Sequence, residues 1–232
     1  MNILTINGTM RKQSTYNTGR ILGENIAGEN DTVEELFLPE AIPHFCMGCA
    51  ACVMNSEEKC PHYEYTSKLT EKIDAADVLI FTTPVFVFHT TGQMKTLLDH
   101  YAYRWMVHRP SEKMFSKQAV IIATAAGGGT KSTIKDIKDS LFYWGVGRIY
   151  TYGSNVAAAS WNGVKDKKRN RIESDIKKLA EKIKRKSGKV KPSLNVKLLF
   201  KFIRLMQKGG GFNKVDNDYW RNNGWLDGKK PW

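Results

Sequence analysis

The feature that most constrains the fold of this chain is a regular alternation of strand-like and helix-like segments. The strand-like segments are apolar runs at Asn2–Ile6, Thr32–Leu38, Val78–Thr82, Ala119–Thr124 and residues 146–153. Helical patterns alternate with them at residues 14–27, 66–76, 92–107, 131–144 and 164–186. Five strand–helix units in succession predict an α/β fold, namely a doubly wound, five-stranded parallel sheet with helices on both faces.

Ligands of such sheets bind outside the carboxyl ends of the strands, so the loops after strands one, three and four form the candidate site. Loop one, residues 7–18, leads from a strand into a helix and is rich in hydroxyl and amide groups. A helix N-terminus offers unpaired N–H groups and a positive dipole, which suit a phosphate. Ser14, Thr15, Asn17 and Thr18 add side-chain donors. Helix capping is the alternative explanation for the same residue types.

Loops two and three differ from loop one in composition. Loop two, residues 82–95, carries large apolar side chains, which either cover the core or face a planar ligand. Loop three, residues 124–129, consists of small residues that let a ligand edge approach the backbone closely. Two other phosphate motifs are excluded. No G-x-G-x-x-G follows the first strand, and Thr130 replaces the glycine that a P-loop requires before Lys131.

Taken in order, these segments are similar to the NADPH-dependent FMN reductase and quinone reductase branch of the flavodoxin-like flavoproteins. The similarity covers about residues 1–155. The residues that carry it are Asn7-Gly8-Thr9 with Arg11, Ser14-Thr15-Tyr16-Asn17-Thr18, Thr83-Pro84-Val85-Phe86, Gly92-Gln93-Met94-Lys95 with Asp99, and Thr124 to Gly128. Met10 departs from the pattern, since many members have proline there, and the length of loop one is closer to that of the quinone reductases.

The resemblance implies a flavodoxin-like fold that binds FMN. Loop one would hold the phosphate, loop two would pack along the isoalloxazine, and loop three would close the other side. The FMN-binding residues implied in this way are Thr9, Arg11, Ser14, Thr15, Tyr16, Asn17, Thr18, Pro84, Val85, Phe86, Val87, Phe88, Thr124, Ala125, Ala126, Gly127 and Gly128.

The resemblance also implies an enzyme, an FMN-dependent oxidoreductase that passes electrons from NAD(P)H, its substrate, to a quinone, a flavin or another small-molecule acceptor. The flavin carries the chemistry of such enzymes, so no catalytic side chain is predicted. The alternative is an electron carrier of the iron–sulfur flavoprotein type, without a small-molecule substrate of its own. Flavodoxin-like and ferredoxin-like carriers are usually small and acidic, whereas this chain is longer and neutral to basic.

The positive charge is confined to one part of the chain. Residues 1–163 carry 15 Lys/Arg against 16 Asp/Glu, whereas residues 164–208 carry 17 against 4. Because the body is neutral, nucleic-acid binding by the whole domain is not expected. Met1 leads directly into the first apolar run, without the pattern of a secretory signal, and no stretch is apolar enough to span a membrane. A cytoplasmic protein is therefore expected.

All four cysteines lie in one short segment, as Cys46, Cys49, Cys52 and Cys60, with the spacing C-x2-C-x2-C-x7-C. In a cytoplasmic protein such clustering indicates metal, cluster or redox chemistry rather than structural disulfides. The segment is similar to the ferredoxin runs that end in Cys-Pro and to the compact motif of the iron–sulfur flavoproteins. It predicts a four-iron four-sulfur cluster. Free or disulfide-forming thiols and a tetrahedral zinc site remain the alternatives.

Residues 189–232 are predicted to form a C-terminal arm beyond a domain of residues 1–188. Lys197, Lys201, Arg204 and Lys208 form one stripe on a helix over residues 194–208, whose remaining surface is mostly apolar. We expect the arm to cap the body or to contribute to the contact of a homodimer, the state that the resemblance implies. Peripheral contact with an anionic membrane through the basic helix is the alternative.

Overall fold

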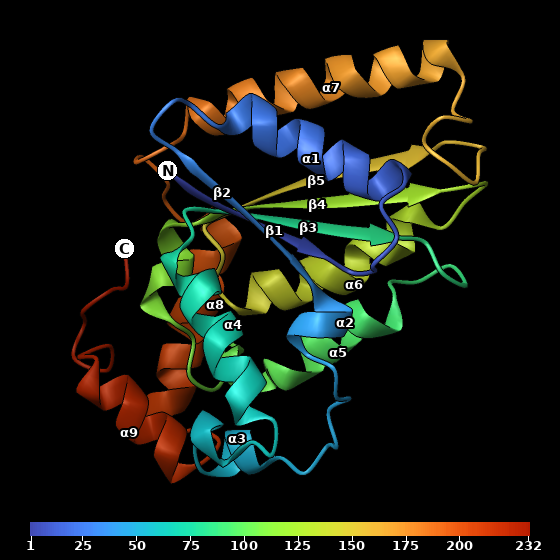
Figure 1. Ribbon diagram of the computed structural model, residues 1–232. Helices are drawn as coiled ribbons and strands as arrows, with labels where there is room; N and C mark the ends of the chain where they lie inside the picture. The colour runs from blue at the N-terminus through green and yellow to red at the C-terminus, as the bar shows by residue number, and fades with distance from the viewer.

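Five parallel strands form the centre of the computed structural model, which describes residues 1–232 (Figure 1). The strands are β1 (Asn2–Asn7), β2 (Thr32–Phe37), β3 (Val78–Pro84), β4 (Gln118–Ala125) and β5 (Arg148–Asn155). Their order across the sheet is β2-β1-β3-β4-β5. The predicted fold class, an α/β doubly wound parallel sheet of five strands, is confirmed.

Helices cover both faces of this sheet, as Figure 1 shows. One face carries α1 (Ser14–Ile26) and α7 (Asp166–Lys184), and the other carries α4 (Tyr63–Ala75), α5 (Gly92–His100) and α6 (Thr130–Tyr143). Successive strand residues alternate between the two cores: Val78 and Ile80 of β3 pack under α1 and α7, whereas Leu79 and Phe81 pack on the opposite side. Burial on both faces explains why the central strands read as continuous apolar runs.

Most of these helices begin and end within three residues of the predicted positions, but the helix predicted over residues 92–107 is wrong at its C-terminal end. α5 ends at His100, and a 3-10 turn over Ala102–Arg104 follows it. The buried Arg104 guanidinium donates hydrogen bonds of 2.8 and 3.0 Å to the two carboxylate oxygens of Asp74. This paired charge holds the chain away from a continued helical path.

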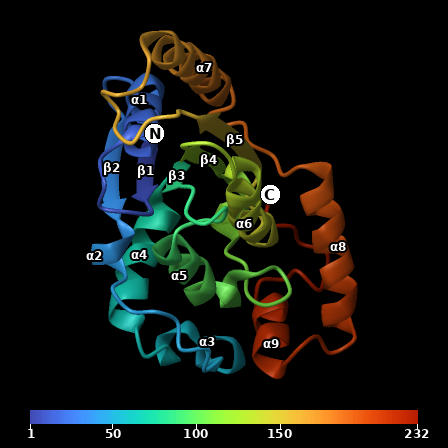
Figure 2. The same ribbon diagram turned by 90° about the vertical axis from the view of Figure 1, so that its right-hand side faces the viewer.

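The C-terminal arm packs along one side of the body, where Figure 2 shows one of its two helices, α8, at the right-hand edge and the other, α9, at the bottom between α3 and α8. They are α8 (Leu194–Lys208) and α9 (Lys214–Asn222), so the predicted helix over residues 194–208 is confirmed. Phe200 stacks on Trp220 with 4.8 Å between ring centres, and Trp225 meets both rings edge-on. All three side chains are fully buried, so the arm caps the body as expected.

The predicted boundary at residue 188 falls between α7 and α8. That residues 1–188 and 189–232 form two separate units stays a prediction.

None of the helices combines the length and the apolar character that a bilayer span requires.

Candidate functional site

A hollow of about 280 Å³ lies at the carboxyl ends of the strands, on the side toward which the arrows of β3, β4 and β5 point in Figure 1. Its walls come from the ends of β1, β3 and β4, from the first turn of α1, and from the loops after β1, β3, β4 and β5. The residues that line this strand-end hollow are Asn7, Thr9, Arg11, Gln13, Ser14, Thr15, Tyr16, Thr82, Pro84, Val85, Phe86, Thr124, Ala125, Ala126, Val156, Ala158 and Ala159.

Hydrogen bonds between the strand ends fix the start of loop one. The backbone N–H of Gly8 donates to the Thr82 carbonyl at 2.8 Å, and the Thr91 hydroxyl donates to the Gly8 carbonyl at 2.9 Å. A Cβ atom on Gly8 would lie only 2.8 Å from Thr91 Oγ1 and 3.1 Å from the Thr82 carbonyl oxygen. The close approach of loop one to β3 therefore requires glycine at this position.

The first turn of α1 opens into the hollow without a side-chain cap. Gln13 occupies the N-cap position, but its Oε1 accepts a hydrogen bond of 2.9 Å from the Trp161 N–H instead of from the helix. The buried hydroxyl residues Ser14 and Thr15 line the hollow at this point. Uncapped backbone N–H groups, the positive end of the helix dipole and two hydroxyls form a donor set that fits a phosphate.

The end of β3 and the loop after it supply an apolar wall. Pro84, Val85 and Phe86 line the hollow. Reciprocal backbone hydrogen bonds of 3.0 Å join Phe86 and His89, which closes a tight turn whose central residues, Val87 and Phe88, have φ values of +50° and +63°. A β-branched residue in the left-handed region is strained, so the surrounding bonds must hold this turn in place.

The predicted FMN-binding residues fall into two groups, according to whether they line the hollow. Those that line it are Thr9, Arg11, Ser14, Thr15, Tyr16, Pro84, Val85, Phe86, Thr124, Ala125 and Ala126. Those that do not line it are Asn17, Thr18, Val87, Phe88, Gly127 and Gly128. Asn17 Nδ2 donates to the Gln13 carbonyl at 3.0 Å and Thr18 Oγ1 donates to the Ser14 carbonyl at 2.7 Å, so both side chains bond to nearby backbone. Contact of any of these residues with FMN stays a prediction.

Sequence reasoning did not single out several residues of the hollow. They are Asn7, Gln13, Thr82, Val156, Ala158 and Ala159. The last three follow β5, whose carboxyl end lies at the same edge of the sheet as the ends of β3 and β4. Small residues follow β5 as they follow β4, so the sequence signal that predicts loop three is also present in the loop after the fifth strand.

The segment between β2 and α4 brings the four cysteines near one another. It contains the short helices α2 (Leu38–Ala41) and α3 (Ala51–Met54) and a 3-10 turn over Glu57–Lys59. All four cysteines are free thiols, and none of them lines the strand-end hollow. Burial raises the pKa of the Cys52 thiol, and the nearby thiols of Cys60, Cys46 and Cys49 raise it further. The four thiols are therefore close enough to influence one another, but they do not form a group of ligand atoms in metal-binding range, so a four-sulfur site stays a prediction.

Two histidines that the sequence analysis did not identify lie beside Cys60. The Cys60 sulfur and one ring nitrogen each from His62 and His100 lie within 4.8 Å of one another. His62 Nδ1 is 3.0 Å from His100 Nε2, and His100 Nδ1 is 2.8 Å from the Thr96 carbonyl oxygen. Sulfur and imidazole together are zinc ligands, so Cys60 belongs to a mixed set as well as to the predicted all-sulfur set. No periodic pattern links these histidines, because they lie on different elements.

A buried ion pair ties the cysteine segment to the arm. The Arg109 guanidinium donates to Asp216 Oδ1 at 2.5 Å, to the Val53 carbonyl at 3.1 Å and to the Cys52 carbonyl. Asp216, on α9, is fully buried and also lies 2.7 Å from His108 Nδ1. Asn213 Nδ2 adds a bond of 3.3 Å to the Val53 carbonyl. Figure 2 shows α3 and α9 next to each other, consistent with these bonds.

A match to a family model shows which protein family the chain belongs to. The family model described as NADPH-dependent FMN reductase matches residues 1–163. The chain belongs to the NADPH-dependent FMN reductase family. The matched region contains all five strands, the strand-end hollow and the four cysteines, whereas the arm lies outside it.

Individual relatives of this FMN reductase family member are distant. An iron–sulfur flavoprotein of Archaeoglobus fulgidus is 24% identical over 196 residues, which cover 84% of this chain and 85% of the relative. An iron–sulfur flavoprotein of Methanocaldococcus jannaschii is 25% identical over 182 residues, which cover 75% and 88%. The fold is similar to that of an NAD(P)H:quinone oxidoreductase from Methanothermobacter marburgensis, with a TM-score of 0.61 and 16% identity over 78% of this chain and 95% of that one.

A second solved structure with a similar fold is an FMN-dependent NADH-azoreductase from Bacillus anthracis in complex with FMN. Its TM-score is 0.58 at 13% identity, and the alignment covers 79% of this chain and all of the azoreductase. These likenesses establish the flavodoxin-like fold of the body.

The two loop-one residues Ser14 and Asn17 make a matched pair for testing the phosphate site. Ser14→Ala removes a hydroxyl from the wall of the hollow, so it should weaken FMN binding about tenfold or more while leaving riboflavin binding nearly unchanged. Asn17→Ala removes bonds that hold loop one, so it should weaken both flavins by similar factors. Fluorescence titration measures the four affinities. Equal losses for FMN and riboflavin in Ser14→Ala would place the phosphate elsewhere.

Proposed function

We propose that this protein binds FMN in the strand-end hollow and passes electrons from NAD(P)H to a quinone, a flavin or another small-molecule acceptor. The observation that carries the proposal is the hollow itself, in which an uncapped helix start faces an apolar wall. When bound, FMN supplies the redox chemistry, accepting electrons from a reduced nicotinamide and passing them on. Membership of the FMN reductase family supports this function.

Different residues of the chain would hold the phosphate and the ring of FMN. The first turn of α1, with Ser14 and Thr15, would bind the phosphate. Thr15 Oγ1 lies 2.5 Å from Thr124 Oγ1, which fixes the hydroxyl against the end of β4. The exposed Arg11 side chain, whose guanidinium donates to the Ala159 carbonyl, adds a positive charge at the rim. Pro84 to Phe86 would pack along the ring, and the small residues Thr124 to Ala126 would leave space for its edge.

We propose further that Cys46, Cys49, Cys52 and Cys60 hold a four-iron four-sulfur cluster. The four free thiols lie in one short segment, and the curated relatives with 24% and 25% identity are named iron–sulfur flavoproteins. Arg109 and Asn213 would hold the backbone of Cys52 and Val53 in place while the cluster assembles. These names also support the second candidate function, an electron carrier without a small-molecule substrate.

A homodimer is the oligomeric state that we propose. Phe86, Val87 and Phe88 are 47%, 92% and 67% exposed on the turn beside the hollow. Three consecutive apolar side chains at the rim of a ligand site are typical of a surface that a partner covers. A second copy of the chain would cover them and help to enclose the flavin.

Steady-state oxidation of NADH and NADPH distinguishes the reductase from the electron carrier. FMN-reconstituted protein should oxidise one of the two nicotinamides in the presence of a quinone or free FMN, whereas flavin-free protein should not. The measurement is the loss of absorbance at the nicotinamide band under anaerobic conditions. A protein whose flavin is reduced by dithionite, but by neither nicotinamide, would support the carrier and contradict the reductase.

Metal analysis of two neighbouring variants tests the cluster. Anaerobically reconstituted protein should contain about four irons per chain, and Cys49→Ala should lose most of that iron because a ligand is removed. Met47→Ala, a change at an exposed neighbour in the same loop, should retain it. Zinc that binds equally to the wild-type protein and to Cys49→Ala would instead favour the mixed set of Cys60, His62 and His100.

A further inference from the structure

Helix α8 presents three different surfaces around its axis. Its buried residues Val196, Phe200, Ile203 and Gln207 pack on the body. The opposite surface, which we call the outward apolar face, consists of large side chains that are 43–70% exposed: Leu194, Leu198, Phe202, Leu205 and Met206. At about 100° per residue these side chains span an arc of roughly 120°. The basic side chains fill the arc between the outward and buried faces, and they are Lys197, Lys201, Arg204 and Lys208.

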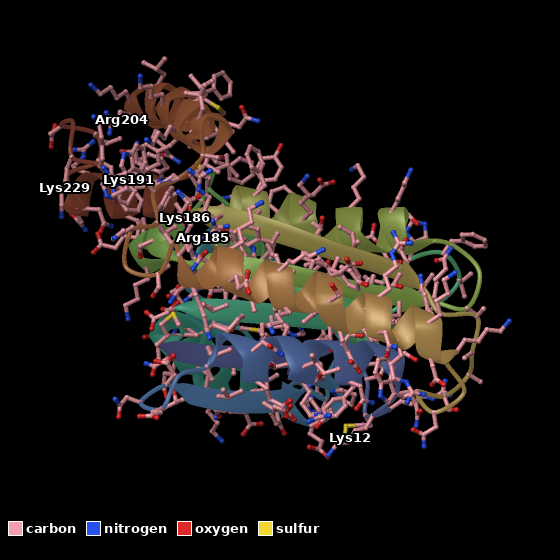
Figure 3. All side chains as sticks on the ribbon, turned by 90° about the horizontal axis from the view of Figure 1, so that it is seen from above. Lys12, Arg185, Lys186, Lys191, Arg204 and Lys229 are labelled. Carbon is pink, nitrogen blue, oxygen red and sulfur yellow. The ribbon has the colours of Figure 1, made fainter.

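The charge around this helix is of one sign. Residues 184–208 contain nine Lys/Arg and no Asp or Glu. Figure 3 shows Arg185, Lys186, Lys191, Arg204 and Lys229 together at the end of the molecule that carries the arm, far from Lys12. This end of the molecule therefore combines an exposed apolar surface with a dense positive field.

Several contacts within the arm anchor α8 in this orientation. Ser193 caps the helix by accepting a hydrogen bond from the Val196 N–H. Arg204 Nη2 donates to the Lys229 carbonyl at 2.6 Å, and the Lys197 ammonium lies 5.9 Å from the centre of the Trp232 ring. Since Phe200 is enclosed by the aromatic cluster, the helix cannot rotate to bury the outward apolar face without breaking that cluster.

We propose that the outward apolar face of α8 docks on an anionic lipid surface. Exposed Leu, Phe and Met side chains would enter the interface, and the exposed Lys201 and Lys208 beside them would pair with anionic headgroups. Charge complementarity favours lipid over a second copy of the chain, because a symmetric contact through this face would bring two segments of nine uncompensated positive charges together. The homodimer proposed above would use the neutral turn beside the hollow instead.

Vesicle co-sedimentation of the full-length protein tests this inference. Wild-type protein should bind vesicles of phosphatidylcholine with phosphatidylglycerol, should bind pure phosphatidylcholine at least about tenfold more weakly, and should dissociate as salt is raised. Leu198→Ser/Phe202→Ser and Lys201→Glu/Lys208→Glu should each weaken binding to the anionic vesicles about tenfold or more. All four side chains are exposed, so flavin content and circular dichroism should match the wild type.

A matched control uses the other helix of the basic segment. Lys167→Glu/Lys178→Glu changes the net charge by the same amount at exposed positions of α7, and binding should largely persist. The inference is overturned if the wild-type protein does not bind anionic vesicles, or if the α8 variants bind as well as the α7 variant. It is also overturned if the α8 variants convert a dimer into a monomer without affecting vesicle binding, since the face would then be a subunit contact.

Discussion

The parallel hydrogen bonding of β1, β3 and β4 is the constraint on which the rest of the structure depends. Asn7 pairs with Thr82 at the end of β1, and Pro84 pairs with Thr124 at the end of β3, so three strands finish at one edge. The Thr82 hydroxyl donates to Asn7 Oδ1 at 2.7 Å and locks two of these ends together. Residues from distant parts of the chain thereby enclose one hollow, and a helix N-terminus points into it.

The arm, which lies outside the matched family region, makes a second set of contacts with the body. Its aromatic cluster anchors α8 and α9 to the body, and Asp216 neutralises the buried Arg109 that holds the backbone of the cysteine segment. Removing one partner of such a buried pair leaves an uncompensated charge, which typically costs about 3–5 kcal/mol. The arm therefore stabilises the cysteine segment at the same time as it presents the outward face of α8.

Features that depend on local sequence patterns could be predicted from the sequence. Continuous apolar runs predicted β3 and β4, because both faces of these strands are buried. The hydroxyl-rich and small-residue segments predicted Ser14 and Thr124 as site residues, and both line the hollow. The end of α5 was mispredicted because it depends on a pair between Arg104 and Asp74, which are 30 residues apart. Arg109 and the two histidines beside Cys60 also contact residues that are far away in the sequence. Such contacts produce no periodic pattern in the sequence, so they could not be predicted from it.

Titration of flavin-free protein with FMN, followed by the quenching of flavin fluorescence, tests the central claim most directly. The account predicts saturation at one FMN per chain. It also predicts that Ala126→Trp, which places an indole inside the strand-end hollow, abolishes binding without unfolding the protein, because Ala126 is exposed. A wild-type protein that does not bind FMN, or an Ala126→Trp variant that binds it with unchanged affinity, would contradict the account.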